Sequence, residues 1–237
     1  MNGQRLVGLP CKVNKVKIHL NEPILKIETL KVRNLIDDYR SGLLVIPEFP
    51  REYVWKTNHA PMLLESLYRG FTVPSLLVWQ SDEAIRSRRN HPRPSRARGA
   101  NWLIDGQQMV ITLSRSLLGD ENIDFVFHPD KERFCLANAT TKIDRNWFHF
   151  ANIIDDKQYH RLHMLPRDRQ SEQREAAFAK VRRILDDEIP LLRMVNYRFE
   201  DVVEIFGHIS IKCVRLTKKE IEGAKLAARH SGFVADE

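Results

Sequence analysis

In the stretch WLIDGQQMVITL, residues 102–113, four polar residues lie between an apolar run and a helix-like apolar run. Its first apolar residues, Trp102 to Ile104, predict a short strand. Asp105-Gly106 predicts a tight turn, because glycine accepts backbone angles that other residues resist. The residues from Gln107 to about Leu118 predict a helix. A helix that begins directly after a turn presents its first unpaired N–H groups outward, where they attract anions. We therefore expect a strand–turn–helix corner.

The polar residues of this corner allow two interpretations. In the functional one, Asp105 holds a metal ion or a ribose hydroxyl, while Gln107 and Gln108 orient a water molecule or bind a base. In the structural one, Asp105 is the N-cap of the helix, a position that aspartate favours, and the two glutamines lie on the surface without a role. The local pattern is compatible with both.

The composition narrows the class of protein. The chain has 237 residues, of which 43% are hydrophobic, and its formal net charge is +7. That charge favours an anionic partner. The longest apolar runs are too short to cross a bilayer and the start of the chain has no secretory pattern, so we expect no membrane association. The cysteines are widely spaced, which indicates reduced thiols in a cytoplasmic protein: Cys11, Cys135 and Cys213.

Much of the positive charge lies in RSRRNHPRPSRAR, residues 86–98, which we call the basic segment. Its prolines exclude regular structure and its like charges repel one another, which favours a solvated loop. The alternative is an arm that follows the phosphate backbone of DNA. The residues that would contact DNA are its six arginines: Arg86, Arg88, Arg89, Arg93, Arg96 and Arg98.

The remaining sequence mixes helical and strand patterns without strict alternation, which favours an α+β fold or a small mixed sheet. We expect helices over residues 31–41, 58–70, 107–118, 171–188 and 200–209, and a further helix capped at Thr217. We expect strands over residues 43–46, 75–79, 102–104, 123–128, 133–136 and 190–195. The apolar face of the helix over 171–188 is predicted to consist of Ala176, Phe178, Val181, Ile184 and Leu185.

Two further stretches carry candidate chemistry. In IPEFPREYVW, residues 46–55, Arg51 lies among aromatic residues and would suit a phosphate or a stacked base. Otherwise the aromatic residues pack in the core and Arg51 meets solvent. The second stretch is IFGHISIKCVRL, residues 205–216, where we expect a helix, a polar loop and another helix.

Neither a hydrolase triad nor a metal site is indicated. His208 and Ser210 have no acid evidently placed to orient them, and a triad is defined by geometry. His160 and His163 have a spacing found in helical metal sites, but no cysteine or acidic pair accompanies them.

In this order, the three stretches resemble the N-terminal domain of GmrSD-type, type IV modification-dependent restriction enzymes, also described as a ParB/sulfiredoxin-like nucleotidase domain. That family reads I-P-x-[FY]-Q-R-x-[FY]-V-W, then D-G-Q-Q-R, then I-F-x-R-I-N-x-x-G-x-x-L. The resemblance is strong over residues 44–118 and moderate over 189–227. The matching residues are Ile46, Pro47, Phe49, Arg51, Tyr53, Val54, Trp55, Asp105, Gly106, Gln107, Gln108, Ile205, Phe206, Ile209 and Leu216.

The resemblance implies one domain over residues 1–237, with a recognisable core over about 28–227 and a ParB/sulfiredoxin-like mixed sheet surrounded by helices. Proteins of this family bind and hydrolyse nucleoside triphosphates, with magnesium, and couple this to DNA cleavage by an HNH-type nuclease in defence against phage. We see no HNH pattern in this sequence, so the nuclease would be another chain or absent.

The resemblance also implies roles for individual residues. Asp105, Gln107 and Gln108 would be the catalytic group, binding metal or ribose and positioning water for attack on the terminal phosphate. Arg51 and Gly106 would hold the nucleotide and its phosphates.

The sequence departs from the family pattern at positions that would serve phosphate chemistry, while the apolar residues around them are kept. A thioether offers no donor, and a neutral imidazole cannot make a bidentate phosphate contact. An arginine at a phosphoryl-transfer transition state is worth on the order of 10³–10⁵ in rate. The altered positions are Pro50 for glutamine, Met109 and His208 for arginine, Ser210 for asparagine and Cys213 for glycine.

We therefore favour a nucleotide-binding domain of a restriction or phage-defence system whose hydrolysis is impaired or lost. One alternative is an active nucleotidase subunit that drives a separate HNH-type nuclease. Another is a non-catalytic module that binds DNA or a partner subunit. The favoured hypothesis requires the corner and the loop that carries Arg51 to converge around one anion-binding hollow.

Overall fold

The corner lies in a five-stranded sheet of mixed strand directions. The computed structural model describes residues 22–49, 59–83, 85–89, 91–94, 100–118, 124–164 and 171–213. The strand order is β1-β8-β3-β4-β2, in which β3 is parallel to β8 and β2 is parallel to β4, while the other two pairs are antiparallel. The strands are β1 (Ile24–Lys31), β2 (Leu44–Val45), β3 (Leu76–Ser81), β4 (Ala100–Asp105) and β8 (Glu188–Val195).

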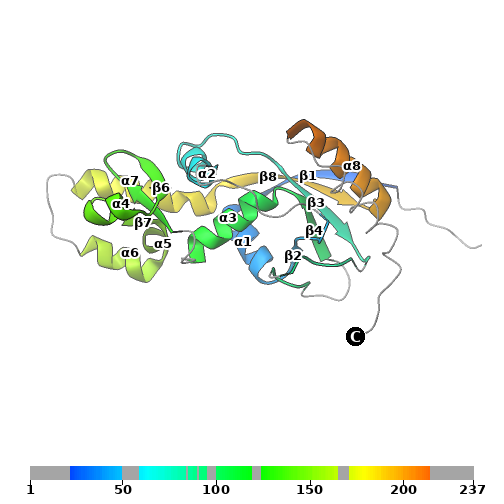
Figure 1. Cartoon of the computed structure of the whole chain (residues 1–237), viewed down its shortest axis with the longest axis horizontal. Helices are drawn as coiled ribbons and strands as arrows, with labels where there is room; N and C mark the ends of the chain where they lie inside the picture. Colours follow the sequence, from blue (N-terminus) through cyan, green and yellow to red (C-terminus); the bar gives the residue numbers. More distant parts are fainter. Residues whose placement is uncertain are drawn as a thin grey trace, which may run out of the picture.

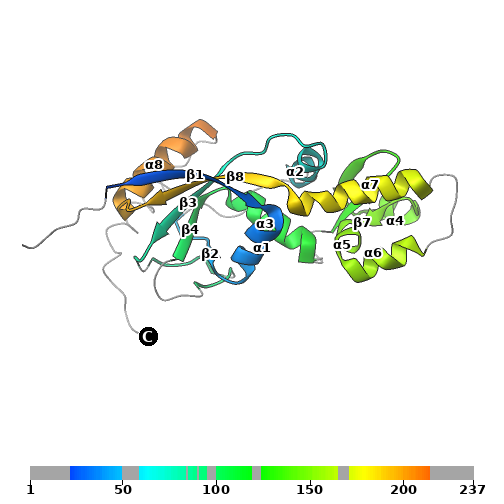
Figure 2. The same cartoon turned by 180° about the vertical axis from the view of Figure 1, so that it is seen from behind.

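Helices cover both faces of this sheet, as Figures 1 and 2 show. One face packs against α8 (Phe199–Cys213), and the other against α1 (Val32–Arg40) and α3 (Gln107–Leu118). Side chains of a strand point alternately to its two faces. Along β4, Trp102 and Ile104 accordingly join the apolar cluster under α8, whereas Leu103 joins the cluster under α1 and α3.

A second, three-stranded sheet lies at the far end of the elongated molecule (Figure 1). Its order is β6-β5-β7, and the apolar cluster under α1 and α3 continues into it through phenylalanines such as Phe127 and Phe134. Its strands are β5 (Phe125–His128), β6 (Arg133–Leu136) and β7 (Phe148–His149). The helices at this end are α2 (His59–Tyr68), α4 (Ala139–Ile143), α5 (Phe150–Ile154), α6 (Asp156–His163) and α7 (Ser171–Arg183).

Most of the expected elements are confirmed, and the fold is α+β. α3 has the predicted bounds, and the predicted hairpin is the antiparallel pair β5 and β6. The helices α1 and α2 are followed by Gly42 and Gly70, whose φ angles of +75° and +68° are those that glycine accepts at a helix end. Asn58 and Thr217, the predicted caps, lie outside the described residues.

Two predictions for the helix over 171–188 were wrong. The helix predicted over 171–188 ends at Arg183 and is followed by a 3-10 helix (Ile184–Asp186). Asp187 is extended, and β8 begins at Glu188, two residues before Pro190. On α7 the small residue that faces the core is Ala177, and Ala176 is exposed.

The loop predicted after Ile209 is helical instead, because α8 continues to Cys213. Nothing over residues 208–213 is a proline or a glycine, so the chain has no strong helix breaker there. In the described part of the chain, no helix is both long and apolar enough to cross a membrane.

Candidate functional site

The turn at the corner depends on Gly106. β4 ends at Asp105 and α3 begins at Gln107, and between them Gly106 has a φ of +92°. A Cβ atom at this position would lie 2.3 Å from Cδ2 of Leu76, the first residue of β3. Both the backbone angle and the close approach to Leu76 disfavour any other residue, and the tight turn predicted from Asp-Gly is confirmed.

Asp105 stabilises the turn rather than capping the helix directly. Its Oδ1 accepts a hydrogen bond from the backbone N–H of Gly106 at 2.8 Å. The carbonyl of Gly106 accepts the first helical bond, from the N–H of Val110 at 3.2 Å, so Gly106 occupies the N-cap position. The register between β3 and β4 also shifts between Leu77 and Val78, directly opposite this end of β4. The N-cap interpretation of Asp105 was therefore wrong by one residue.

The two glutamines of the corner are buried, which contradicts the interpretation that placed them on the surface. Gln107 is 6% exposed and Gln108 is 9% exposed. The side-chain oxygen Oε1 of Gln107 accepts a hydrogen bond from Nη1 of Arg88 at 3.1 Å. The corner is thus tied to the basic segment, which the sequence patterns had not connected with it.

The described part of the basic segment is held against the chain near the corner. Its backbone runs antiparallel to the first motif: Arg88 N–H donates to the carbonyl of Ile46, and Glu48 N–H donates to the carbonyl of Arg86, both at 2.9 Å. Arg88 is half-buried, while Arg86, Arg89 and Arg93 are exposed. A wholly solvated loop is therefore excluded around Arg88. Arg96 and Arg98 lie outside the described residues.

Three residues that no motif had indicated lie near this contact. The hydroxyl of Tyr39, on α1, is hydrogen-bonded to Nδ1 of His91 in the basic segment. Burial raises the pKa of Tyr39 to about 12, against the opposing effect of nearby Arg115 and Arg88. Burial also lowers the pKa of His91, and the same two arginines lower it further. Both arginines therefore act electrostatically on the Tyr39–His91 pair.

One of these residues had a signal in the sequence. Arg115 follows Gln108 by seven residues, which is two turns of α3, so both lie on one side of the helix. Tyr39 and His91 come from other parts of the chain, and only the packing of α1 and the basic segment brings them here.

The first and third motifs also meet. β2 and β4 are parallel neighbours, so the chain leaves both strands at the same edge of the sheet. The first motif follows β2, and its Phe49 packs edge-on against Phe206 of the third motif, with ring centroids 5.7 Å apart. Phe199 lies against the same ring of Phe49, at 5.5 Å. The three motifs thus converge at one end of the sheet.

The chain also matches a known protein family. Residues 32–227 match the family described as GmrSD restriction endonuclease, N-terminal domain. The chain belongs to that family. It is accordingly a restriction-related module of the kind associated with phage defence. No curated protein matches the chain.

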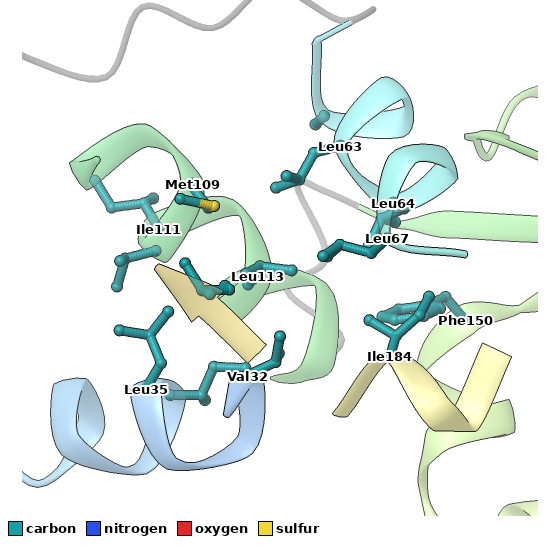
Figure 3. Packing of buried hydrophobic residues seen from close by; sticks show 14 of the residues in the cluster. Val32, Leu35, Leu63, Leu64, Leu67, Met109, Ile111, Leu113, Phe150 and Ile184 are labelled. Atoms are coloured by element: carbon teal, nitrogen blue, oxygen red, sulfur yellow. The ribbon is translucent and has the colours of Figure 1, made fainter. Parts of the chain in front are cut away.

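The positions at which we expected a departure from the family pattern lie in different surroundings. Met109 is 3% exposed and belongs to the apolar cluster that includes Leu63 and Leu113 (Figure 3). His208 lies on the outer side of α8 with 76% of its side chain exposed, and its Nε2 is 3.8 Å from Oε1 of Glu204. Met109 is therefore a core residue, and His208 is a surface residue.

The other altered positions give less information about a binding site. Ser210 and Cys213 are helical residues of α8, so Cys213 does not stand at a turn that would require glycine. Pro50 and Arg51 lie outside the described residues, and with them the predicted meeting of Arg51 with the corner. Within the described ranges, no three His, Cys, Asp or Glu residues are grouped closely enough to hold a metal ion.

Proposed function

We propose that this chain is the phosphate-recognising domain of a modification-dependent restriction or phage-defence system, and that it binds a nucleoside triphosphate at the corner with impaired or lost hydrolysis. The observation that carries the proposal is the burial of Met109. In the family motif an arginine follows D-G-Q-Q, whereas here the side chain lies in the apolar core and has no hydrogen-bond donor.

The groups that remain at the corner are suited to binding. α3 begins there, and the N-terminus of a helix attracts anions through its unpaired N–H groups. Gln107 and Gln108 supply buried amides, and Arg88 supplies a guanidinium group in contact with Gln107. These groups favour a bound phosphate, while the groups that would stabilise the transition state of hydrolysis are reduced.

Magnesium would reach such a site together with the triphosphate. Mg²⁺ takes most of its ligands from phosphate oxygens and water, with one or two carboxylates from the protein. Asp105 is the carboxylate at the corner and is partly exposed, so it fits this role. Magnesium would supply charge neutralisation between the phosphates, and Asp105 would fix its place beside the turn.

We further propose that any DNA cleavage depends on an HNH-type nuclease elsewhere in the system, in another chain or another part of the protein. The exposed arginines Arg86, Arg89 and Arg93 favour contact with DNA phosphates at the surface. Asp105, Gln107 and Gln108 would still support turnover in the alternative that the chain is an active nucleotidase.

Two measurements on the purified chain test the proposal. Equilibrium binding of a non-hydrolysable triphosphate analogue with magnesium should be detected. Phosphate release from each nucleoside triphosphate should stay near background and should be the same in an Asp105→Asn variant. Turnover that Asp105→Asn abolishes would instead establish an active nucleotidase, and a lack of any analogue binding would reject the proposal.

A further inference from the structure

We propose that β1 is an interface at which two copies of this chain pair edge to edge, with their β1 strands antiparallel, to form one continuous sheet. β1 is the outermost strand of the five-stranded sheet, and none of the described residues forms a strand beyond it (Figure 2). An unpaired edge presents a row of backbone N–H and C=O groups that can bond another strand. The pairing does not depend on a nucleotide at the corner.

The two edges of this sheet differ. The strand at the opposite edge, β2, has only two residues, and both are buried. An edge strand that short is protected against pairing with another chain. β1 has eight residues, and three of its apolar side chains are exposed: Ile24 by 47%, Leu25 by 49% and Ile27 by 81%. A long edge strand with exposed apolar side chains is typical of a place where another strand binds.

The backbone groups on the outer edge of β1 belong to alternate residues. Val32, directly after β1, donates its backbone N–H to the carbonyl of Asp187 at 3.0 Å, in line with the register of β1 and β8. The backbone groups of successive residues point to opposite sides of a strand. The N–H and C=O groups of Leu25, Ile27 and Thr29 therefore point away from β8, toward the outer edge.

One register makes this edge complementary to itself. If a twofold axis passes Ile27, this residue lies opposite its own copy, and the backbone groups of the two copies face each other. Lys26 and Glu28 then lie opposite Glu28 and Lys26 of the second copy. Opposite charges directly across an antiparallel pair stabilise it, and like charges destabilise it. An axis one residue away in either direction would place Lys26 against Lys26 or Glu28 against Glu28.

The charges within one copy favour these contacts. Lys26 is exposed, and its direct partner on β8 is Arg193, which has the same charge. Glu28 accepts a hydrogen bond from Nε of Arg193 at 3.0 Å through Oε2. A carboxylate has two oxygens and can accept further bonds. Glu28 of the second copy would thus give Lys26 the opposite charge that β8 does not place directly across from it.

The apolar side chains of β1 favour the same register. Leu25 and Ile27 lie opposite Met194 and Leu192 of β8, and therefore on the face of the sheet that carries α8. In the pair, the two copies of Ile27 meet at the axis, with Leu25 on either side. Pairing thus removes the most exposed apolar side chain of β1 from water, which favours association.

Sedimentation velocity of the full chain over the micromolar range tests the pairing. We expect the wild-type chain to sediment as a dimer. Ile27→Lys places two ammonium groups at the axis, so we expect it to raise the dimer dissociation constant by about 100-fold or more. The matched control is Ile143→Lys, because Ile143 is 82% exposed and lies on α4, at the other end of the molecule (Figure 1). This control should change the dimer dissociation constant by less than about twofold.

Exchanging the charges tests the register. Lys26→Glu and Glu28→Lys each oppose like charges in a pair of identical copies, so each should raise the dimer dissociation constant by roughly 5-fold to 100-fold. A mixture of the two variants restores both contacts between opposite charges. It should form a mixed dimer at concentrations where each variant alone is monomeric. Glu28→Lys also removes the ion pair with Arg193, so thermal unfolding checks that it is folded; should it unfold, Lys26→Glu and Ile27→Lys decide the question.

Three outcomes would overturn the proposal. A wild-type chain that stays monomeric over this range would assign the edge of β1 to another segment or to a different partner. A dimer that Ile27→Lys and Ile143→Lys affect equally would place the interface elsewhere. Folded charge variants that fail to form a mixed dimer would exclude the twofold pairing at Ile27.

Discussion

Gly106 lies so close to Leu76 that a methyl group on its Cα would be 2.3 Å from Leu76 Cδ2. Because Gly106 also has a φ of +92°, Gly106→Ala imposes both a clash and a strained backbone. We expect it to lower the free energy of unfolding by roughly 2–5 kcal/mol, measured by urea denaturation.

Gly70→Ala is the matched control for this change. Gly70 also has a positive φ, +68°, but a Cβ there would have no neighbour within 4 Å. The expected loss is therefore the backbone part alone, about 1–2 kcal/mol. Equal losses at the two positions would show that the contact with Leu76 has no energetic role.

Met109→Arg should destabilise the protein rather than restore hydrolysis. The side chain lies in the apolar core beside α2, and a guanidinium group there would be an unpaired buried charge (Figure 3). We expect a loss of about 3–5 kcal/mol, read from chemical denaturation, and no gain in phosphate release. Met109→Leu, which keeps the volume, should cost less than about 1.5 kcal/mol. A stable and active Met109→Arg protein would contradict the assignment of this position to the core.

The contact between Phe49 and Phe206 should appear as an energetic coupling between the first and third motifs. A double-mutant cycle with Phe49→Leu and Phe206→Leu should give a coupling of about 0.5–1.5 kcal/mol, because the rings meet edge to face. The control cycle pairs Phe49→Leu with Phe127→Leu, since Phe127 belongs to the other apolar cluster. Additive losses in the first cycle would show that the two motifs are energetically independent.

Acidification should weaken the fold through His91. Burial and the charges of Arg88 and Arg115 lower its pKa in the folded state, so the unfolded chain binds the proton more readily. The contribution of His91 is therefore complete above pH of about 6.5, the ordinary histidine value, and is lost as the pH falls toward the lower folded pKa. The slope of unfolding free energy against pH should be smaller in His91→Gln.

The same histidine should respond to a phosphate bound at the corner, where we propose that one binds. A nuclear magnetic resonance titration of the His91 ring should give a pKa below the usual histidine value in the free protein. Tripolyphosphate should raise that pKa, because a bound anion offsets the two arginines. A titration midpoint that the ligand leaves unchanged would separate His91 from the site.

The local sequence predicts the bounds of some helices and strands correctly and those of others incorrectly. Helix α3 was predicted with its observed bounds, because apolar periodicity and the Asp-Gly turn both mark its start. The helix predicted over 171–188 ends at Arg183 instead, and a strand begins at Glu188, two residues before Pro190. The prediction also failed after Ile209, where polar residues suggested a loop although the backbone stays helical. In both places the backbone conformation depends on strand pairing or helix packing with distant residues. The local sequence pattern carries no information about those contacts.

The sequence by itself determined the corner, the α+β class and the family, because each depends on residues that are neighbours along the chain. The corner depends on a glycine that accepts a positive φ, the fold class on helical and strand spacing, and the family on three motifs in a fixed order. Only the tertiary structure decided that Met109 belongs to the core and that the glutamines are buried. It alone placed Arg88 against Gln107 and His91 against Tyr39. The physical reason is that sheet pairing and helix packing set contacts between residues dozens of positions apart, and no periodicity records them.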